Sequence, residues 1–310
     1  MQSVPYLGHT IRRWEIGDST FLAWPERGAR LMHWHHQRAD GSLREILHWP
    51  ELTADELGDT TVAKVRGGNP ILFPFNARVF DEGEIHFWKD PAGQRRPMPM
   101  HGFARQGSFR LESINDRGFI AVLEPTAADA EVYPFDYTFS VKYRFHRQRF
   151  TCEFALENHG EERIPWSAGH HFYFAAPWTE NQTRDNYMIE LPPGETVRQS
   201  AVGSLVPGPE LPRRSRLSDP ELIDAIHVNL AGNTVRFGPI DGSEHVSLTH
   251  GTTNPPPADA AFVTWTAAPD VPYYCVEPWM GPPNAPEHGR GLHWVAPGAT
   301  GRFAVEVAIG

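Results

Sequence analysis

A strict alternation of apolar and polar side chains between positions 138 and 157 constrains this chain more than any other feature. Every second residue is apolar in residues 138–146, and the pattern resumes in residues 150–157 after Arg147 and Gln148. A period of two places the apolar side chains on one face of a β-strand, and two such runs joined by a short turn form a hairpin. We therefore expect an antiparallel hairpin with one buried face.

Further paired runs occur along the chain. Residues 108–114 and 119–124 flank a turn that contains Asn, Asp and Gly, and residues 227–230 and 234–237 flank Ala-Gly-Asn. Such turns are typical of hairpins, so each pair is predicted to be one. A last strand is expected at residues 302–309, where apolar and polar residues again alternate.

Helical patterns are nearly missing from the sequence. Only residues 50–57 allow one or two helical turns, and the short Pro-rich pieces are typical of surface loops between strands. Strands spread from end to end, without a linker, favour an all-β fold over two unlike domains. We predict one large antiparallel β-sandwich that spans residues 1–310 as a single domain.

Composition excludes several kinds of partner. The chain has 310 residues, and its 38 acidic and 28 basic side chains give a net charge of −10, which disfavours binding to a phosphate backbone. No stretch approaches the roughly 18 apolar residues of a membrane span. Cys152 and Cys275 lie in apolar stretches and are expected to be buried free thiols. These features predict a cytoplasmic monomer or homodimer with neither nucleic acid nor membrane as a partner.

Three histidines lie close together at His33, His35 and His36. Positions 33 and 35 share one face of an expected strand, which is a spacing that a metal site can use. No carboxylate or thiol cluster accompanies them in the sequence, so we interpret them as ordinary strand residues and predict no metal. The common nucleotide-binding and hydrolase motifs are missing from the sequence as well, and no cofactor is predicted.

Four other segments interrupt apolar runs with charged or polar residues. Residues 67–78 read GGNPILFPFNAR, and residues 100–105 read MHGFAR. Residues 170–174 read HHFYF, and residues 274–279 read YCVEPW. Each segment alone is compatible with hydrogen-bonded core residues, but their combination and order are far more specific.

In this order the segments resemble the aldose 1-epimerase (galactose mutarotase-like) family, which has a GG-x-P bend leading to an arginine, then HG-x-A-R, H-x-Y-F and a late glutamate. The resemblance implies the galactose mutarotase-like supersandwich. It also implies that Arg78 and His101 position the substrate, that His171 is the catalytic acid and that Glu277 is the catalytic base. A family aspartate contacts the sugar hydroxyls, and Asp224 is the candidate for it.

Some positions within these segments need a choice or depart from the family. His171 is preferred to His170 because the H-x-Y-F spacing to Tyr173 falls on it. Asn69 stands where a β-branched residue is common, and Ala175 stands where many relatives have asparagine. These departures concern the identity of the substrate more than the chemistry.

The implied reaction suits these residue types. Interconversion of sugar anomers requires one proton to leave the C1 hydroxyl and another to reach the ring oxygen, which a carboxylate and an imidazole can perform. Glu277 is ordinarily ionised near pH 7, and His171 can gain a proton there. Flat rings pack against the apolar face of a pyranose, so Trp279, Trp88 and Trp178 are candidate stacking residues.

Four functions remain open on the sequence. The leading hypothesis is a mutarotase that acts on an aldohexose or related pyranose, with a small-molecule sugar as its partner. A sugar-phosphate (hexose-6-phosphate) 1-epimerase needs cationic side chains at the pocket edge, and four loop arginines are candidates: Arg95, Arg96, Arg213 and Arg214. A non-catalytic carbohydrate-binding protein on the same fold and a glycoside hydrolase are the other two hypotheses, of which the hydrolase needs a second carboxylate facing Glu277.

Overall fold

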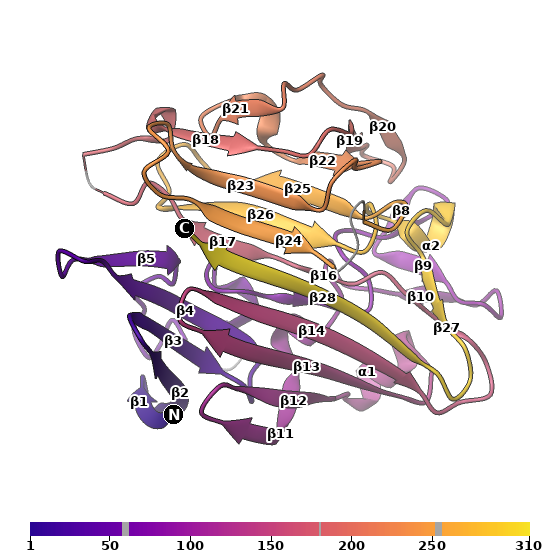
Figure 1. Cartoon of the computed structure of the whole chain (residues 1–310). Helices are drawn as coiled ribbons and strands as arrows, with labels where there is room; N and C mark the ends of the chain where they lie inside the picture. Colours follow the sequence, from indigo (N-terminus) through magenta and orange to yellow (C-terminus); the bar gives the residue numbers. More distant parts are fainter. Residues whose placement is uncertain (58–61, 180, 252–255) are drawn as a thin grey trace.

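The structure is a computed structural model that describes residues 1–57, 62–179, 181–251 and 256–310. Two large sheets contain most of the strand residues (Figure 1), and all pairings between their strands are antiparallel. The predicted all-β antiparallel sandwich is therefore confirmed. No helix in the described part of the chain is long and apolar enough to cross a membrane.

The first sheet, called sheet A, has thirteen strands. Eleven of them follow one another in the order β1 (Gln2–Tyr6), β2 (His9–Ile16), β3 (Ser19–Trp24), β4 (Arg30–Gln37), β5 (Leu43–Leu47), β17 (Phe172–Ala175), β26 (Tyr273–Trp279), β25 (Ala261–Trp265), β22 (Ala225–Val228), β19 (Glu195–Gln199) and β20 (Leu205–Pro207). The short strands β16 (Gly169–His170) and β6 (Ile71–Leu72) pair beside β26.

The second sheet, called sheet B, has nine strands, in the order β11 (Ser108–Asn115), β12 (Gly118–Glu124), β13 (Tyr137–His146), β14 (Arg149–Asn158), β28 (Thr300–Ile309), β24 (Val246–His250), β23 (Thr234–Pro239), β18 (Tyr187–Glu190) and β21 (Arg214–Arg216). Three two-stranded pieces complete the strands: β7 (Phe80–Asp81) with β8 (Glu84–Ile85), β9 (Phe87–Lys89) with β10 (Arg95–Pro97), and β15 (Ile164–Trp166) with β27 (His293–Val295).

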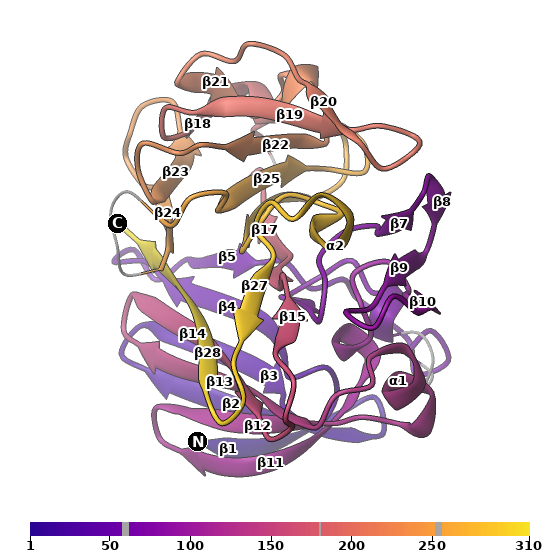
Figure 2. The ribbon, with the colours of Figure 1, turned by 90° about the vertical axis from the view of Figure 1, so that its right-hand side faces the viewer.

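Helices are short and lie in the connections (Figure 2). They are α1 (Ala127–Val132), α2 (Ala285–His288) and the single turns η1 (Val62–Lys64), η2 (Ala104–Gln106), η3 (Arg184–Asn186) and η4 (Pro220–Leu222). Residues 50–57 form no helix and contain one turn, closed by the Leu57 N–H that donates to the Thr53 carbonyl at 3.1 Å. Strands thus supply nearly all of the regular structure.

The predicted hairpin around residue 147 is confirmed. Strands β13 and β14 pair along their whole length, from Tyr137 opposite Asn158 to His146 opposite Arg149. Their alternating apolar side chains are buried against sheet A, as when the ring of Phe145 stacks on Phe21 with 4.5 Å between the ring centroids. The main core therefore lies between the two sheets.

The hairpin of strands β11 and β12 and the last strand, β28, are also confirmed. The hairpin predicted from residues 227–230 and 234–237 is wrong. Strand β22 belongs to sheet A and pairs with β19 and β25, whereas β23 belongs to sheet B and pairs with β18 and β24. The short connection crosses from one sheet to the other, because Val235 and Phe237 are buried in the main core while Val228 packs in a separate cluster on sheet A.

Candidate functional site

A cavity of about 710 Å³ opens beside the middle strands of sheet A, and Glu277 on β26 lies in its wall. Along β26 the side chains of Tyr274 and Val276 enter the main core, so Cys275 and Glu277 point to the other face of the sheet. Only 2% of Glu277 is exposed. A carboxyl group on so deeply buried a strand marks a candidate functional site.

His171 lies in the same cavity, between β16 and β17. Its Nδ1 is 3.5 Å from the Oε1 of Glu277, and its ring stacks on Tyr173 with 4.7 Å between the centroids. Neither the His171 Nδ1 nor the Glu277 Oε2 has a hydrogen-bond partner among the described residues. The neighbouring His170 points the other way and packs on Phe154 in the core, as the alternation of a strand requires.

Burial controls the protonation of this pair. Burial, followed by the nearby guanidinium of Arg105, lowers the pKa of His171 to about 3. Burial, followed by the nearby carboxylate of Asp224, raises the pKa of Glu277 well above its ordinary value. Both shifts favour the uncharged form of each group, so burial disfavours a charged imidazole beside a charged carboxylate in the free pocket. Burial therefore works against the ionised form of Glu277 that its ordinary pKa predicts.

His101 faces His171 across the cavity, with 5.4 Å between the ring centroids. Its Nδ1 accepts a hydrogen bond from the Ala77 N–H at 3.0 Å, so the ring hydrogen resides on Nε2 and makes that nitrogen a donor. The next residue must be glycine, because a Cβ at Gly102 would lie 1.9 Å from the Phe73 carbonyl oxygen and φ is +69°. The HG pair thus brings one imidazole close to the site.

The other candidates from the sequence contribute to the same cavity. Asp224 follows η4 with φ of 56°, and both it and the exposed Arg78 line the opening. Trp279 lies in the wall, with its indole N–H donating to the His170 carbonyl at 3.2 Å. The structure therefore brings all six predicted site residues together: Glu277, His171, Arg78, His101, Asp224 and Trp279.

Trp88 and Trp178, the two further stacking candidates, lie elsewhere. Trp88 is 1% exposed and packs against Phe75 in the core. Trp178 lies beneath the Arg44 guanidinium, 3.4 Å from the ring centroid. Both are packing residues, because the interior of so large a sandwich uses aromatic rings to fill its volume.

The cavity is strongly basic although the chain is acidic. Among the described residues it is lined by two carboxylates and by five basic side chains, namely Lys64, Arg66, Arg78, Arg105 and Arg198. Four of these make no ion pair with the described residues, while Arg198 lies 3.3 Å from Glu221. An excess of positive charge in a cavity favours an anionic ligand group.

The four arginines predicted at the pocket edge are not among the described residues that line it, and that prediction is wrong. Arg95 is 3.1 Å from the Asp81 carboxylate and Arg96 is 2.7 Å from that of Asp90, in the β7–β10 region. Arg213 lies 2.6 Å from Glu190, and Arg214 is exposed on β21 at the end of sheet B. Loop membership alone does not say at which edge of a sandwich a side chain lies.

Several contributing residues were not predicted. The Asn69 Oδ1 accepts the His171 N–H at 3.3 Å, and its amide nitrogen lies 3.0 Å from the His170 Nδ1, so it holds both histidines. The fully buried Arg30 donates to the Gly67 carbonyl at 2.8 Å and fixes the bend that precedes Asn69. Asn69 and Arg105 lie inside the quoted motifs, whereas nothing in the sequence connects Arg30 with the bend.

Two groups among the described residues have the composition of a metal site. One is His171, Cys275 and Glu277 in the cavity; the other is His33, His35 and Glu45 on the neighbouring strands of sheet A. Burial raises the pKa of Cys275 well above its ordinary value, which keeps the thiol protonated and a poor ligand. The cavity is therefore better suited to proton transfer than to metal binding.

Comparison with known proteins identifies a family and relatives that match part of the chain. A profile described as aldose 1-epimerase matches residues 14–255, which is well over half of the chain. Chromosomal protein LacX of Lactococcus lactis subsp. lactis is 26% identical over 126 residues, which are 40% of this chain and 42% of that protein. The chain thus matches less than half the length of this relative.

Solved structures resemble the chain over nearly its whole length. A galactose mutarotase-like protein from Clostridium acetobutylicum superposes with a TM-score of 0.79 at 15% identity, covering 100% of this chain and 98% of that one. A galactose mutarotase related enzyme from Lactobacillus acidophilus superposes with a TM-score of 0.78 at 18% identity, covering 97% of each chain. At these identities the likeness concerns the fold, and the profile match adds the family: this chain belongs to the aldose 1-epimerase family.

Proposed function

We propose that the protein is an aldose 1-epimerase that interconverts the α and β anomers of an aldohexose or related pyranose. The observation that carries the proposal is the 3.5 Å contact between the His171 Nδ1 and the Glu277 Oε1 in a cavity of about 710 Å³. A cavity of this size suits a monosaccharide. The two oxygens that exchange protons are bonded to one carbon, so an acid and a base that act on them must lie side by side.

One proton on the pair is sufficient for the reaction. With that proton on His171, the Glu277 carboxylate takes the C1 hydroxyl proton while His171 donates to the ring oxygen, and the C1–O5 bond breaks to give the open-chain aldehyde. Rotation about C1–C2 presents the other face of the carbonyl. Reversal of both transfers then closes the ring, with no net change in the charge of the pair.

The remaining pocket residues support this chemistry by holding the sugar. The Nε2–H of His101 and the guanidinium of Arg78 are donors for the ring oxygen or the hydroxyls, and the Asp224 carboxylate is an acceptor. Trp279 supplies a flat ring in the wall. Each of these is a positioning role, which affects substrate binding more than the proton transfers.

Exchange spectroscopy by NMR tests the proposal on the protein as purified. Cross-peaks between the α and β anomeric protons of glucose or galactose should grow faster with enzyme than in buffer alone, in proportion to its concentration. Tight sugar binding without any acceleration would support the carbohydrate-binding alternative instead.

A pH profile tests the protonation of the pair. Because the carboxylate of Asp224 contributes to the raised pKa of Glu277, Asp224→Asn should lower that pKa and the pair should lose its proton at lower pH. We expect the alkaline limb of kcat/KM to move to lower pH, after subtraction of the uncatalysed exchange at each pH. Asp241→Asn, in an exposed turn, should leave the limb in place; an unmoved limb in Asp224→Asn contradicts the assignment of the proton to Glu277.

The basic lining favours a second candidate function, a 1-epimerase of a phosphorylated aldose. Charged side chains that bind phosphate make strong, charge-assisted hydrogen bonds. Lys64, Arg66 and Arg105 line the cavity and make no ion pair with the described residues, as a phosphate site would require. A comparison of exchange rates on glucose and glucose 6-phosphate separates the two candidates.

Substitution of one of these cations measures the contribution of the basic lining. If the substrate is phosphorylated, Arg66→Gln should raise KM for glucose 6-phosphate about tenfold or more, since a hydrogen bond to a charged group contributes roughly 1.5–3 kcal/mol. The KM for glucose should change little, and Arg95→Gln, whose guanidinium pairs with Asp81 outside the cavity, is the matched control. Equal effects of Arg66→Gln on both sugars would argue for a neutral substrate.

A further inference from the structure

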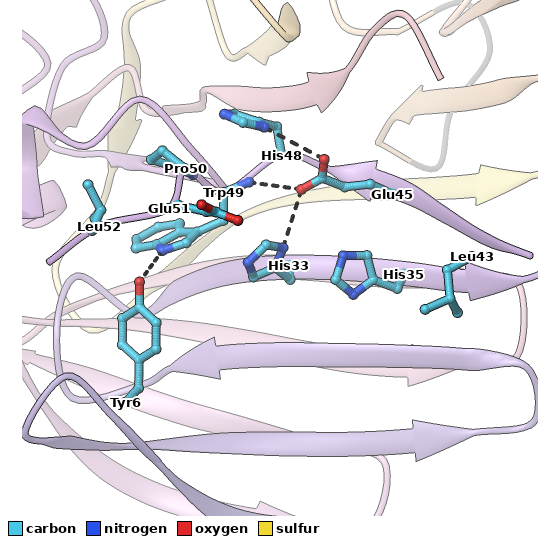
Figure 3. A pocket seen from close by; sticks show the side chains of 10 residues that line it. All are labelled: Tyr6, His33, His35, Leu43, Glu45, His48, Trp49, Pro50, Glu51 and Leu52. Atoms are coloured by element: carbon cyan, nitrogen blue, oxygen red, sulfur yellow. Dashed lines mark hydrogen bonds and ion pairs between the residues drawn. The ribbon is translucent and has the colours of Figure 1, made fainter. Parts of the chain in front are cut away.

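A second cavity, of about 780 Å³, lies over strands β4 and β5 of sheet A, and the proposed function makes no use of it. Its wall carries Glu51 and four further metal-ligating side chains, which we call the histidine cluster: His33, His35, Glu45 and His48. Figure 3 shows the rings of His33 and His35 next to each other on one strand and the Glu45 carboxylate between them and His48. The cluster thus presents nitrogen and oxygen ligands to a single space.

Strand pairing assembles this cluster. His35 lies directly opposite Glu45 in the register of β4 with β5, and a register shift occurs at Trp34, next to His35. One ligand atom from each of His33, His35 and Glu45 lies within 4.8 Å of the other two. In a tetrahedral Zn²⁺ site with bonds of about 2.0–2.1 Å the ligand atoms lie about 3.4 Å apart, so the three side chains must move closer together to hold an ion.

Unsatisfied nitrogens point to a missing ligand. The Nδ1 atoms of His33 and His48 are buried and make no hydrogen bond with the described residues, although they lie 3.4 and 3.7 Å from the Glu45 carboxylate. Buried polar atoms normally have a partner, so an exception needs an explanation. The Trp49 N–H donates to the Glu45 Oε1 at 3.2 Å and orients the carboxylate, as outer partners of metal ligands do.

We propose that His33, His35 and Glu45 form a binding site for a divalent transition metal of the Zn²⁺ class. Two imidazoles and a carboxylate are a ligand set that Zn²⁺ uses when one coordination position stays open, and His48 is within reach of the same carboxylate. Glu45, which lies opposite His35 on the next strand, supplies the carboxylate that the sequence alone did not show near the histidines.

The cluster is accessible from solvent. The side chains of His33 and Glu45 are 18% and 33% exposed, so an ion can enter from solvent.

Titration of the full chain with Zn²⁺ tests the site, with untagged protein that has been dialysed against a chelator. Isothermal titration calorimetry at pH 7.5 should show one equivalent bound. Loss of an outer-shell partner already weakens metal binding about 10–100-fold, so loss of a ligand in His33→Gln, His35→Gln or Glu45→Gln should weaken it at least as much. His36→Gln, the next position on the same strand, is the matched control and should bind as the wild type does.

Two further measurements separate this site from the catalytic cavity and from misfolding. Zn²⁺ affinity should be unchanged in His171→Asn, and the Co²⁺-loaded protein should lack the thiolate charge-transfer band that Cys275 would produce. Metal-free melting temperatures identify variants that fail to fold, and Glu45→Gln keeps the side-chain shape. The proposal is overturned if the wild type does not bind Zn²⁺ or if the three ligand variants bind it as tightly as the wild type does. Loss of Zn²⁺ binding only in His171→Asn would also overturn it.

Discussion

Replacement of Glu277 by glutamine should slow anomer exchange by about 10²–10⁴-fold, the usual contribution of a positioned acid or base. The amide has nearly the same shape and still forms hydrogen bonds, but it can neither take the C1 hydroxyl proton nor pass one to His171. We therefore expect a fall in kcat with little change in KM, measured by NMR exchange on the sugar that the wild-type protein turns over. Substrate binding depends mainly on other residues in the cavity.

Stability provides an internal control for this variant. Burial favours the uncharged form of the Glu277 carboxyl, so an uncharged amide of equal size should leave the melting temperature close to that of the wild type. Glu153→Gln, on sheet B and paired with Arg302, removes a carboxylate that does not line the cavity and should retain full activity. Full activity in Glu277→Gln would remove the base from the mechanism.

Replacement of His171 by asparagine should cause a loss of similar size, about 10²–10⁴-fold in kcat, because the ring oxygen then has no acid to protonate it. Groups that act as one unit are not additive, so the double variant with Glu277→Gln should be hardly slower than the slower single variant. The 3.5 Å contact between the two side chains is the structural reason for this expectation.

Two comparisons make the result for His171 specific. His36→Asn removes a partly exposed histidine outside the cavity and should be fully active. If the fold-decrease in kcat of the double variant equals the product of the two single decreases, His171 and Glu277 act independently. That result would contradict a shared proton.

The sequence predicted the strands well because their signal is local. The alternation on either side of residue 147 specifies both strands and their turn, and β13 and β14 pair as expected. The false hairpin at residues 227–237 shows the limit of such a signal. Alternation reveals that a segment is a strand with one buried face, but the choice of sheet depends on distant partners, here β19 and β25 for one strand and β18 and β24 for the other.

The candidate site was predictable where function requires particular residue types in short motifs. All six residues that the motifs suggested line one cavity, whereas Arg95 and Trp88, chosen for residue type alone, lie outside it. The sequence showed no carboxylate cluster near His33 and His35, so it did not favour a metal site there. Pairing of the two strands brings Glu45 next to these histidines. The compartment, the single domain and the number of subunits stay predictions.

A crystal structure of Glu277→Gln with a bound aldohexose tests the central claim most directly. The account predicts that O1 lies within about 3.2 Å of the amide at position 277 and that O5 lies equally close to the His171 ring, with the pyranose among His101, Arg78 and Trp279. A sugar that binds in the cavity with C1 turned away from both side chains would contradict the proposed acid and base.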